Sequence, residues 1–258
     1  MPRRSVGLQQ GYYYHVYNRG VDRGPIFLEP DNYSFFLRRL RQFIADGTAE
    51  IIAYCLMPNH YHMLVHVCTD GFSALMQRLG MSYANAINKR YRRIGPLFQG
   101  RFQAKVVAKD EYLLHLSRYI HLNPVRAGLV TKAEEWPYSS YADFIGLGER
   151  TLVQPGIILE QLTREGSPPE DARRTYKRFV EGWSGADDRL APMLFEEQPR
   201  SGSGSLNYSS PEVVVVLVSL NRLSALTLSY VAPNQFLRWV DLINMLPLPC
   251  SAWPRSTR

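Results

Sequence analysis

Two strand-like segments that meet at a proline constrain the fold of this chain more than any other feature. Residues 50–55 and 60–67 are rich in β-branched, aromatic and other apolar residues, and Pro58 interrupts the run between them. His60 and His62 lie one residue apart in the second segment. Because side chains alternate between the two faces of a strand, both imidazoles point the same way, roughly 7 Å apart along the chain. The segment therefore predicts a strand that presents two histidines on one face.

Two imidazoles on one face can hold a divalent metal ion. The pair is equally compatible with two buried, hydrogen-bonded histidines, because apolar residues surround it. A later segment favours the metal: Tyr119 and Asn123 lie four residues apart on a predicted helix and so share a face. Two histidine nitrogens and one amide oxygen would leave coordination positions open for phosphate oxygens and water, beside a phenol that could act as a nucleophile.

Three motifs together resemble those of a known family. They are MPNHYHMLV at residues 57–65, FQGRF at residues 98–102 and RYIHLNPVRAGLV at residues 118–130. Over residues 12–147 the chain resembles the REP-associated tyrosine transposases, which are insertion-sequence-200-like members of the His-hydrophobic-His (HUH) single-strand transposases. The resemblance implies a ferredoxin-like core with both histidines on a central strand and the tyrosine on a helix that crosses nearby.

The resemblance also implies a reaction and a site. Tyr119 would be the catalytic nucleophile, and His60, His62 and Asn123 would bind Mg²⁺ or Mn²⁺. The implied function is the cleavage and rejoining of single-stranded DNA in transposition, by metal-dependent transesterification through a 5′-phosphotyrosine. The implied partner is single-stranded or hairpin DNA formed by repeated palindromes, with the protein acting as a monomer or a homodimer.

Two other functions stay open at this point. A domesticated regulator would bind the same hairpins without cleaving them, although the intact residues of the implied site argue against that loss. A metal-dependent phosphodiester hydrolase would use metal-bound water and would need an acidic ligand beside the histidines. The nearest acidic residues, Glu50 and Asp70, are predicted at strand ends.

Positive charge is concentrated in the first half of the chain. The net charge of +7 and the isoelectric point near 9.4 indicate an acidic partner such as nucleic acid, whereas residues 149–197 are slightly acidic. Four cations among residues 89–93 follow a predicted helix, where they are compatible both with the helix dipole and with phosphate contacts. The predicted DNA-binding residues are His15, Arg19, Lys89, Arg90, Arg92, Arg93, Arg101 and Lys105.

Hydrophobic periodicity predicts the other elements of the core. Asp31 is the predicted N-cap of the first helix and Asp110 that of the last, and Pro124 is predicted to end or kink the last helix at Asn123. The elements are a strand at 12–20, a helix at 31–45, strands at 50–55 and 60–67, a helix from 72, a strand at 98–108 and a helix from 111. This order favours an α+β fold, a ferredoxin-like sandwich with a mainly antiparallel sheet and helices packed on one side.

The chain is predicted to have three parts. Residues 1–147 form the HUH tyrosine transposase domain, residues 148–199 a helical C-terminal extension, and residues 200–258 a linker and a disordered tail of unknown structure. A Ser-Gly repeat at residues 201–205 marks the last boundary.

Cysteine usage and hydropathy predict a cytoplasmic, nucleoid-associated protein. Cys55, Cys68 and Cys250 have no ligand-like spacing and are interpreted as reduced, packed thiols. No apolar segment follows the first residues, so no secretion signal is expected. The apolar run at residues 213–232 is not expected to span a membrane, because the central Arg222 would cost roughly 2.5–3.5 kcal/mol on insertion.

Overall fold

The structure of the protein is a computed structural model that describes residues 8–107, 110–148, 152–163 and 168–183. The described residues all belong to one compact unit, Met1–Gln198. The second unit, Pro199–Arg258, lies outside the described residues, and with it the predicted linker, the tail and the apolar run at residues 213–232.

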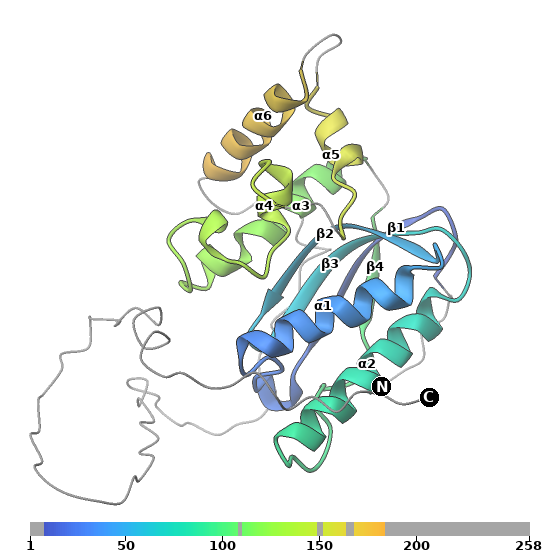
Figure 1. The fold of residues 1–258 in the computed structure, drawn as a ribbon. Coiled ribbons are helices and arrows are strands. Elements are labelled where there is room, and N and C mark those ends of the chain that lie inside the picture. Colours follow the sequence, from blue (N-terminus) through green and yellow to red (C-terminus); the bar gives the residue numbers. More distant parts are fainter. Residues whose placement is uncertain (1–7, 108–109, 149–151, 164–167, 184–258) are drawn as a thin grey trace, which may run out of the picture. The chain divides into compact units, whose positions relative to one another are not determined.

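A four-stranded antiparallel sheet forms the centre of the fold (Figure 1). In spatial order its strands are β2 (Ala49–Met57), β3 (His60–Val67), β1 (Tyr13–Arg19) and β4 (Gln103–Val107). The chain reverses at Pro58 and Asn59, so that Met57 lies opposite His60 in the β2–β3 hairpin. The predicted strand at 98–108 is shorter than expected, because Phe98 makes only an isolated bridge to Gly20 before the chain enters β4. The histidine-bearing strand β3 is therefore central, as predicted.

Two long helices cover one face of the sheet, α1 (Pro30–Ile44) and α2 (Phe72–Arg90) (Figure 1). Their apolar stripes pack with inward-facing strand residues such as Val16 and Met63. The predicted cap at Asp31 is wrong. Glu29 caps α1 through a reciprocal capping box with Asn32, and Pro30 begins the helix because its fixed φ suits the first helical position.

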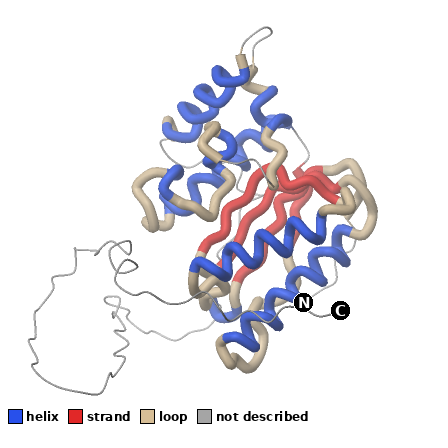
Figure 2. The backbone as a smooth tube through the Cα atoms, viewed as in Figure 1, coloured by secondary structure: helices blue, strands red, loops and turns tan. Residues whose placement is uncertain are grey.

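Helices also cover the second face of the sheet. There α3 (Asp110–Arg126) packs through Leu113, Leu116 and Ile120, and the same hydrophobic cluster includes residues of α4 (Tyr141–Phe144), α5 (Gly156–Glu160) and α6 (Pro169–Glu181). Figure 2 shows the strands between the two sets of helices. The predicted α+β class with an antiparallel sheet is confirmed. The prediction that helices pack on one side of the sheet holds only for α1 and α2. Helix α3 and the helices of the extension pack on the other side through a second apolar surface.

Helix α3 continues through Pro124 to Arg126, so the predicted end at Asn123 is wrong. Pro124 has no amide to donate to the carbonyl oxygen of Ile120, so the helix lacks one hydrogen bond there and still continues for two residues. The carbonyl oxygens of Asn123 and Pro124 accept hydrogen bonds from the amides of Ala127 and Leu129. Asn123 therefore occupies the last turn of a regular helix.

His121 anchors the extension to the core. It is fully buried, with Nδ1 hydrogen bonded to the Tyr176 hydroxyl at 2.7 Å and Nε2 to Ser140 Oγ at 2.9 Å. Burial lowers the pKa of His121 to about 3, so the ring is neutral at neutral pH. This histidine of the RYIHLNPVRAGLV motif thus joins α3 to α6 and to the segment before α4.

Two further predictions concern thiols and membrane spans. Cys55 is buried and Cys68 partly buried, and both are free thiols, while Cys250 lies outside the described residues. In the part of the chain that the structure describes, none of the helices has the length and apolar character to span a bilayer.

Candidate active site

The site is built on the face of β3 that α3 covers. Strand alternation directs His60 and His62 to this face together with Leu64, which belongs to the α3-side hydrophobic cluster. Strand β1 runs antiparallel to β3 and places Tyr17 opposite His62 and Arg19 opposite His60. Residues that lie opposite each other in a sheet share a face, so the two central strands contribute side chains to one site.

His15 and His62 form a buried pair at the centre of the site. Nε2 of His15 lies 2.9 Å from Nδ1 of His62, and the side chains are 0% and 1% exposed. Burial holds the pKa of His62 well below its usual range, and positive charge on His15, His60 and Arg19 lowers it further. His62 is therefore a neutral imidazole at neutral pH, which is the form that binds metals.

His60 lies beside this pair at the edge of the site. Its ring centroid is 5.0 Å from that of His62, with the ring planes at 79°. Nδ1 of His60 is hydrogen bonded to Asn59 Oδ1 at 2.6 Å, and Asn59 belongs to the β2–β3 turn. The turn thus orients the first of the two histidines.

Tyr119 and Asn123 approach the histidines from α3. The Tyr119 ring meets the His62 ring edge-on, with centroids 5.6 Å apart, and lies 6.3 Å from the His15 ring. The Asn123 amide nitrogen donates to the Tyr119 carbonyl oxygen at 3.3 Å. The structure thus brings His60, His62 and Tyr119 into one cluster, with Asn123 beside the tyrosine.

The electrostatics of Tyr119 combine burial with nearby positive charge. Burial raises the pKa of the phenol, and this is partly offset by a hydrogen bond from Asn123 and by the charges of Arg126 and Arg19. The Arg126 guanidinium lies 5.1 Å from the centre of the Tyr119 ring. The phenol is therefore protonated at neutral pH, in surroundings that would stabilise negative charge on its oxygen.

The predicted DNA-binding residues divide into two groups. His15, Arg19 and Lys105 belong to the sheet: Lys105 pairs with His15 across β1–β4, and Arg19 is 9% exposed beside His62 and Tyr119. His15 has no exposed surface, and Nε2 of its ring lies 2.9 Å from Nδ1 of His62.

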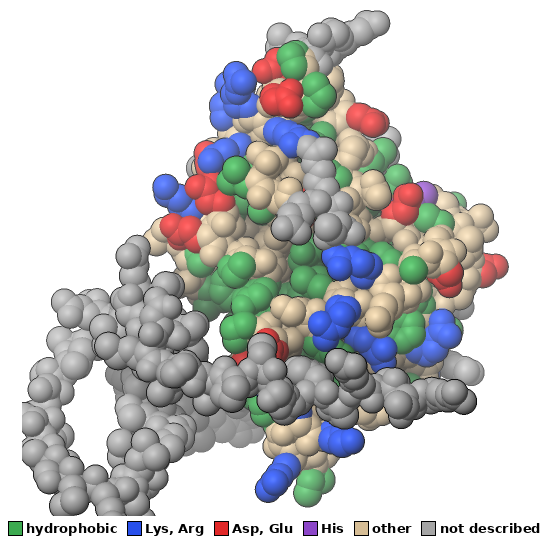
Figure 3. Space-filling view, viewed as in Figure 1, with side chains coloured by type: hydrophobic (Ala, Val, Ile, Leu, Met, Phe, Trp, Pro, Cys, Tyr) green, Lys and Arg blue, Asp and Glu red, His purple; other side chains and the backbone are tan. Residues whose placement is uncertain are grey.

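The second group comprises Lys89 and Arg90 at the end of α2 and three residues of the segment that follows, and it lies toward the same end of the sheet. The segment after α2 returns to the end of β1, where the Val21 amide donates to the Leu97 carbonyl oxygen at 3.0 Å. Arg92 and Arg101 are exposed, whereas Arg90 is paired with Glu29, its Nε lying 2.8 Å from Oε1. Lys and Arg side chains gather around this end of α2 in the space-filling view (Figure 3). Cations thus lie both inside the site and at the end of α2, which packs on the opposite face of the sheet.

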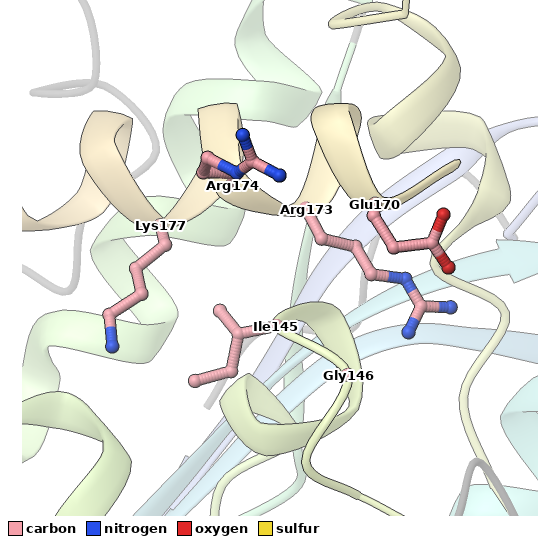
Figure 4. Close-up of a pocket in the computed structure, with 6 residues that line it drawn as sticks. All are labelled: Ile145, Gly146, Glu170, Arg173, Arg174 and Lys177. Carbon is pink, nitrogen blue, oxygen red and sulfur yellow. The ribbon is translucent and has the colours of Figure 1, made fainter. Parts of the chain in front are cut away.

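A separate groove of about 410 Å³ lies on the helical extension (Figure 4). It is lined by Ile145, Gly146, Glu170, Arg173, Arg174 and Lys177. Two of its cations are paired with carboxylates, Arg174 with Asp171 at 3.6 Å and Lys177 with Glu134 at 2.9 Å. The groove shares no residue with the His60–Tyr119 site.

The sequence reasoning assigned no role to His121 or Arg126, although both belong to the RYIHLNPVRAGLV motif. His121 faces the core and Arg126 faces Tyr119. Helical spacing could have indicated Arg126, because it lies seven residues after Tyr119 and hence on the same face of α3.

Comparison with known proteins finds similar sequences and a similar fold. Residues 9–123 match the family model described as Transposase IS200 like. A putative REP-associated tyrosine transposase of Haemophilus influenzae is 29% identical over 104 residues, covering 36% of this chain and 58% of that protein. A REP-associated tyrosine transposase of Escherichia coli is 26% identical over 98 residues, covering 37% and 56%. The matched region therefore spans a little over half the length of these curated relatives.

A solved structure shares the fold. It is titled as a REP-associated tyrosine transposase bound to a REP hairpin, and it matches with a TM-score of 0.50 at 20% sequence identity. The match covers 60% of this chain and 90% of that one. Motifs, fold and sequence matches agree: residues 9–123 of this chain match the family model Transposase IS200 like, and the resemblance of the chain to the REP-associated tyrosine transposases is confirmed.

Proposed function

We propose that this protein cleaves and rejoins single-stranded DNA at hairpins formed by repeated palindromes, through a covalent 5′-phosphotyrosine on Tyr119 and with the help of Mg²⁺ or Mn²⁺. The observation that carries the proposal is the edge-on contact of Tyr119 with the buried His62 ring, at 5.6 Å between centroids. The substrate class rests on the similar structure, whose title names a bound REP hairpin. A monomer or homodimer acting on the nucleoid in the cytoplasm belongs to the same proposal.

His60, His62 and Asn123 would hold the metal ion. The Nδ1 atoms of His62 and His60 are engaged by His15 and Asn59, so Nε2 is the ligand atom in each ring. Asn123 uses its amide nitrogen to bond Tyr119, so its Oδ1 is the ligand atom. Two imidazole nitrogens and one amide oxygen fit an ion that keeps positions for phosphate oxygens and water. When bound, the ion polarises the scissile phosphate and neutralises charge on the departing oxygen.

His15 would act as a positioning residue. If Nε2 of His62 held the metal, Nδ1 would carry the proton and would donate it to Nε2 of His15. Such a hydrogen bond fixes the tautomer and the orientation of a ligand histidine. The buried pair therefore explains why a histidine on the neighbouring strand belongs to the site without contacting DNA.

Tyr119 would attack the scissile phosphorus. A bond forms between its hydroxyl oxygen and phosphorus while the bond from phosphorus to the 3′ oxygen breaks, which leaves a 5′-phosphotyrosine and a free 3′-OH. The phenol must lose its proton in this step, and positive charge on Arg126 and Arg19 stabilises the resulting anion and the phosphate. Because the phosphoester is conserved in the covalent intermediate, the reverse reaction rejoins strands without ATP.

The hydrolase alternative is weakened by the register of the sheet. Glu50, one of the two acidic residues nearest in sequence to the histidines, lies opposite His66 and is hydrogen bonded to it. It therefore does not belong to the His60–His62 pair.

The test is covalent capture of DNA. The full-length protein is incubated with labelled single-stranded hairpin DNA from the flanks of its own gene, with Mn²⁺ or with EDTA, and run on a denaturing gel. We expect a metal-dependent protein–DNA adduct that disappears in Tyr119→Phe and persists in Tyr112→Phe, a matched control on the same helix. Hairpin binding without an adduct would support the regulator, and nicking without an adduct would support the hydrolase. An adduct that survives in Tyr119→Phe contradicts the proposed nucleophile.

A further inference from the structure

A second cluster of potential metal ligands lies at the opposite end of β3. His66 lies on the same face of the strand as His60 and His62, and Cys68 follows two residues later. Across the β2–β3 ladder, Glu50 lies opposite His66. The strand pairing thus brings together a carboxylate, an imidazole and a thiol from two segments of the chain.

The three side chains are close enough to share one ion. His66 Nδ1 lies 3.1 Å from Glu50 Oε2 and 3.7 Å from Cys68 Sγ. All three ligand atoms lie within 4.8 Å of one another. In a tetrahedral zinc site, a histidine nitrogen lies about 3.4 Å from a carboxylate oxygen and about 3.6 Å from a thiolate sulfur, given the usual bond lengths. The cluster needs only small side-chain adjustments to reach that geometry.

The His66 ring is already held in place. It stacks on Tyr13, which lies opposite it on β1, with centroids 4.6 Å apart and an interplanar angle of 22°. Its Nδ1 therefore faces Glu50 and Cys68 from a supported position. A supported ring reduces the entropy that a binding ion would have to overcome.

The ligand types select among metals. Sulfur and imidazole favour Zn²⁺ over Mg²⁺ or Ca²⁺, which prefer oxygen ligands. Thiolate and carboxylate charges together match the charge of a divalent ion. The cluster is also accessible, since Glu50 is exposed and the other two side chains are partly exposed.

We propose that Glu50, His66 and Cys68 bind a Zn²⁺ ion, with a solvent molecule as the fourth ligand. The ion would join β2, the end of β3 and the segment that leads into α2. This site is distinct from the proposed His60–His62–Asn123 site, which contains no sulfur, and it does not depend on the proposed reaction.

The test uses the sulfur ligand as a spectroscopic signature. The full-length protein, stripped of metal with EDTA and desalted, is titrated with Co²⁺ while the near-ultraviolet thiolate-to-cobalt charge-transfer band is recorded. We expect the band to saturate at one equivalent of Co²⁺ per chain. It should disappear when one equivalent of Zn²⁺ is added, because Zn²⁺ binds nitrogen and sulfur sites more tightly than Co²⁺. The double variant with His60→Ala and His62→Ala should keep the band, which separates this site from the first.

Variants locate the sulfur. Cys68→Ser should abolish the band, Cys250→Ser should leave it unchanged, and His66→Ala should weaken Co²⁺ binding at least about tenfold. Circular dichroism of each variant checks that the fold is kept. The proposal is overturned if no band appears at saturating Co²⁺, if the band survives in Cys68→Ser, or if Zn²⁺ fails to displace it.

Discussion

The two ends of strand β3 carry histidines on the same face, yet they meet different surroundings. His62 is 1% exposed and contacts His15 and Tyr119, while the side chain of His66 is 25% exposed and contacts Glu50 and Tyr13. Only Leu64 separates them on that face of the strand. Near His62 the neighbours are the rings of His15 and Tyr119 and the cation Arg19, and near His66 they are a carboxylate and a thiol.

This difference shows that position on a strand does not decide what a histidine does. At the buried end, burial and neighbouring positive charge keep the imidazole neutral, which is the form that binds a metal ion. At the exposed end, charged and sulfur ligands remain available because solvent reduces the cost of placing them together. Strands β1 and β2 and helix α3 supply these neighbours, so the tertiary structure sets the chemistry of each end.

The largest expected effect separates the two ends directly. His62→Ala should reduce formation of the covalent adduct by at least about a thousandfold, because it removes a ligand of an ion that supplies several kcal/mol of transition-state stabilisation. His66→Ala should change the same rate by less than about twofold. Single-turnover adduct assays at saturating DNA measure both. If His62→Ala and His66→Ala reduced the rate of adduct formation equally, the assignment of the reaction to the buried end of β3 would be contradicted.

His121 is a third buried histidine, and its burial makes the stability of the fold depend on pH. Its pKa in the folded protein is about 3, compared with about 6.5 in an unfolded chain, so the unfolded state binds more protons between these values. The contribution of neutral His121 to the free energy of unfolding is therefore complete above about pH 6.5. It falls as the pH is lowered, by roughly 1.4 kcal/mol per pH unit for one proton.

Urea unfolding in EDTA from pH 7 to pH 4 measures this dependence. His121→Gln, which cannot titrate, should flatten the slope relative to the wild type, whereas carboxylates act equally in both proteins. A slope unchanged by the substitution would show that His121 is protonated in the folded state.

The positioning role of His15 predicts an intermediate effect. His15→Ala should weaken Mn²⁺ binding about 10- to 100-fold, because His62 would lose the acceptor that orients its ring. His15→Gln should recover part of the loss, since an amide oxygen can accept the same hydrogen bond. The readout is the Mn²⁺ concentration that gives half-maximal adduct formation, with hairpin affinity measured separately. Equal defects in both variants would indicate a packing role alone.

The smallest expected effect concerns the surface near the buried end. Arg92→Asn combined with Arg93→Ala should weaken hairpin binding at all sequences and reduce the salt dependence, by a slope of about one per lost phosphate contact. Asn suits position 92, where φ is +51°, because it tolerates the left-handed region. Arg174→Ala on the extension is the control. If it changes the slope as much as the double variant does, the phosphate contacts are not concentrated after α2.

Local patterns predicted most of the elements and the spacing of the candidate site. Strand β3 has the predicted bounds, and α2 begins at the predicted residue 72. These predictions succeed because alternation and helical periodicity are properties of short segments. The predicted N-cap of α1 and the predicted end of α3 at Asn123 were wrong, since a cap depends on which side chain reaches the first amides and one missing hydrogen bond at Pro124 does not end a packed helix.

The sequence by itself determined that His60 and His62 share a face of one strand and that Tyr119 and Asn123 share a face of one helix. Only the tertiary structure decided which partners each histidine meets. His15 contacts His62 across 47 residues of chain, and Glu50 reaches His66 across 16. Such contacts depend on the register between strands, and register is selected by burial over the whole sheet. A segment read alone therefore predicts which side chains point together, and the assembled sheet decides what they point at.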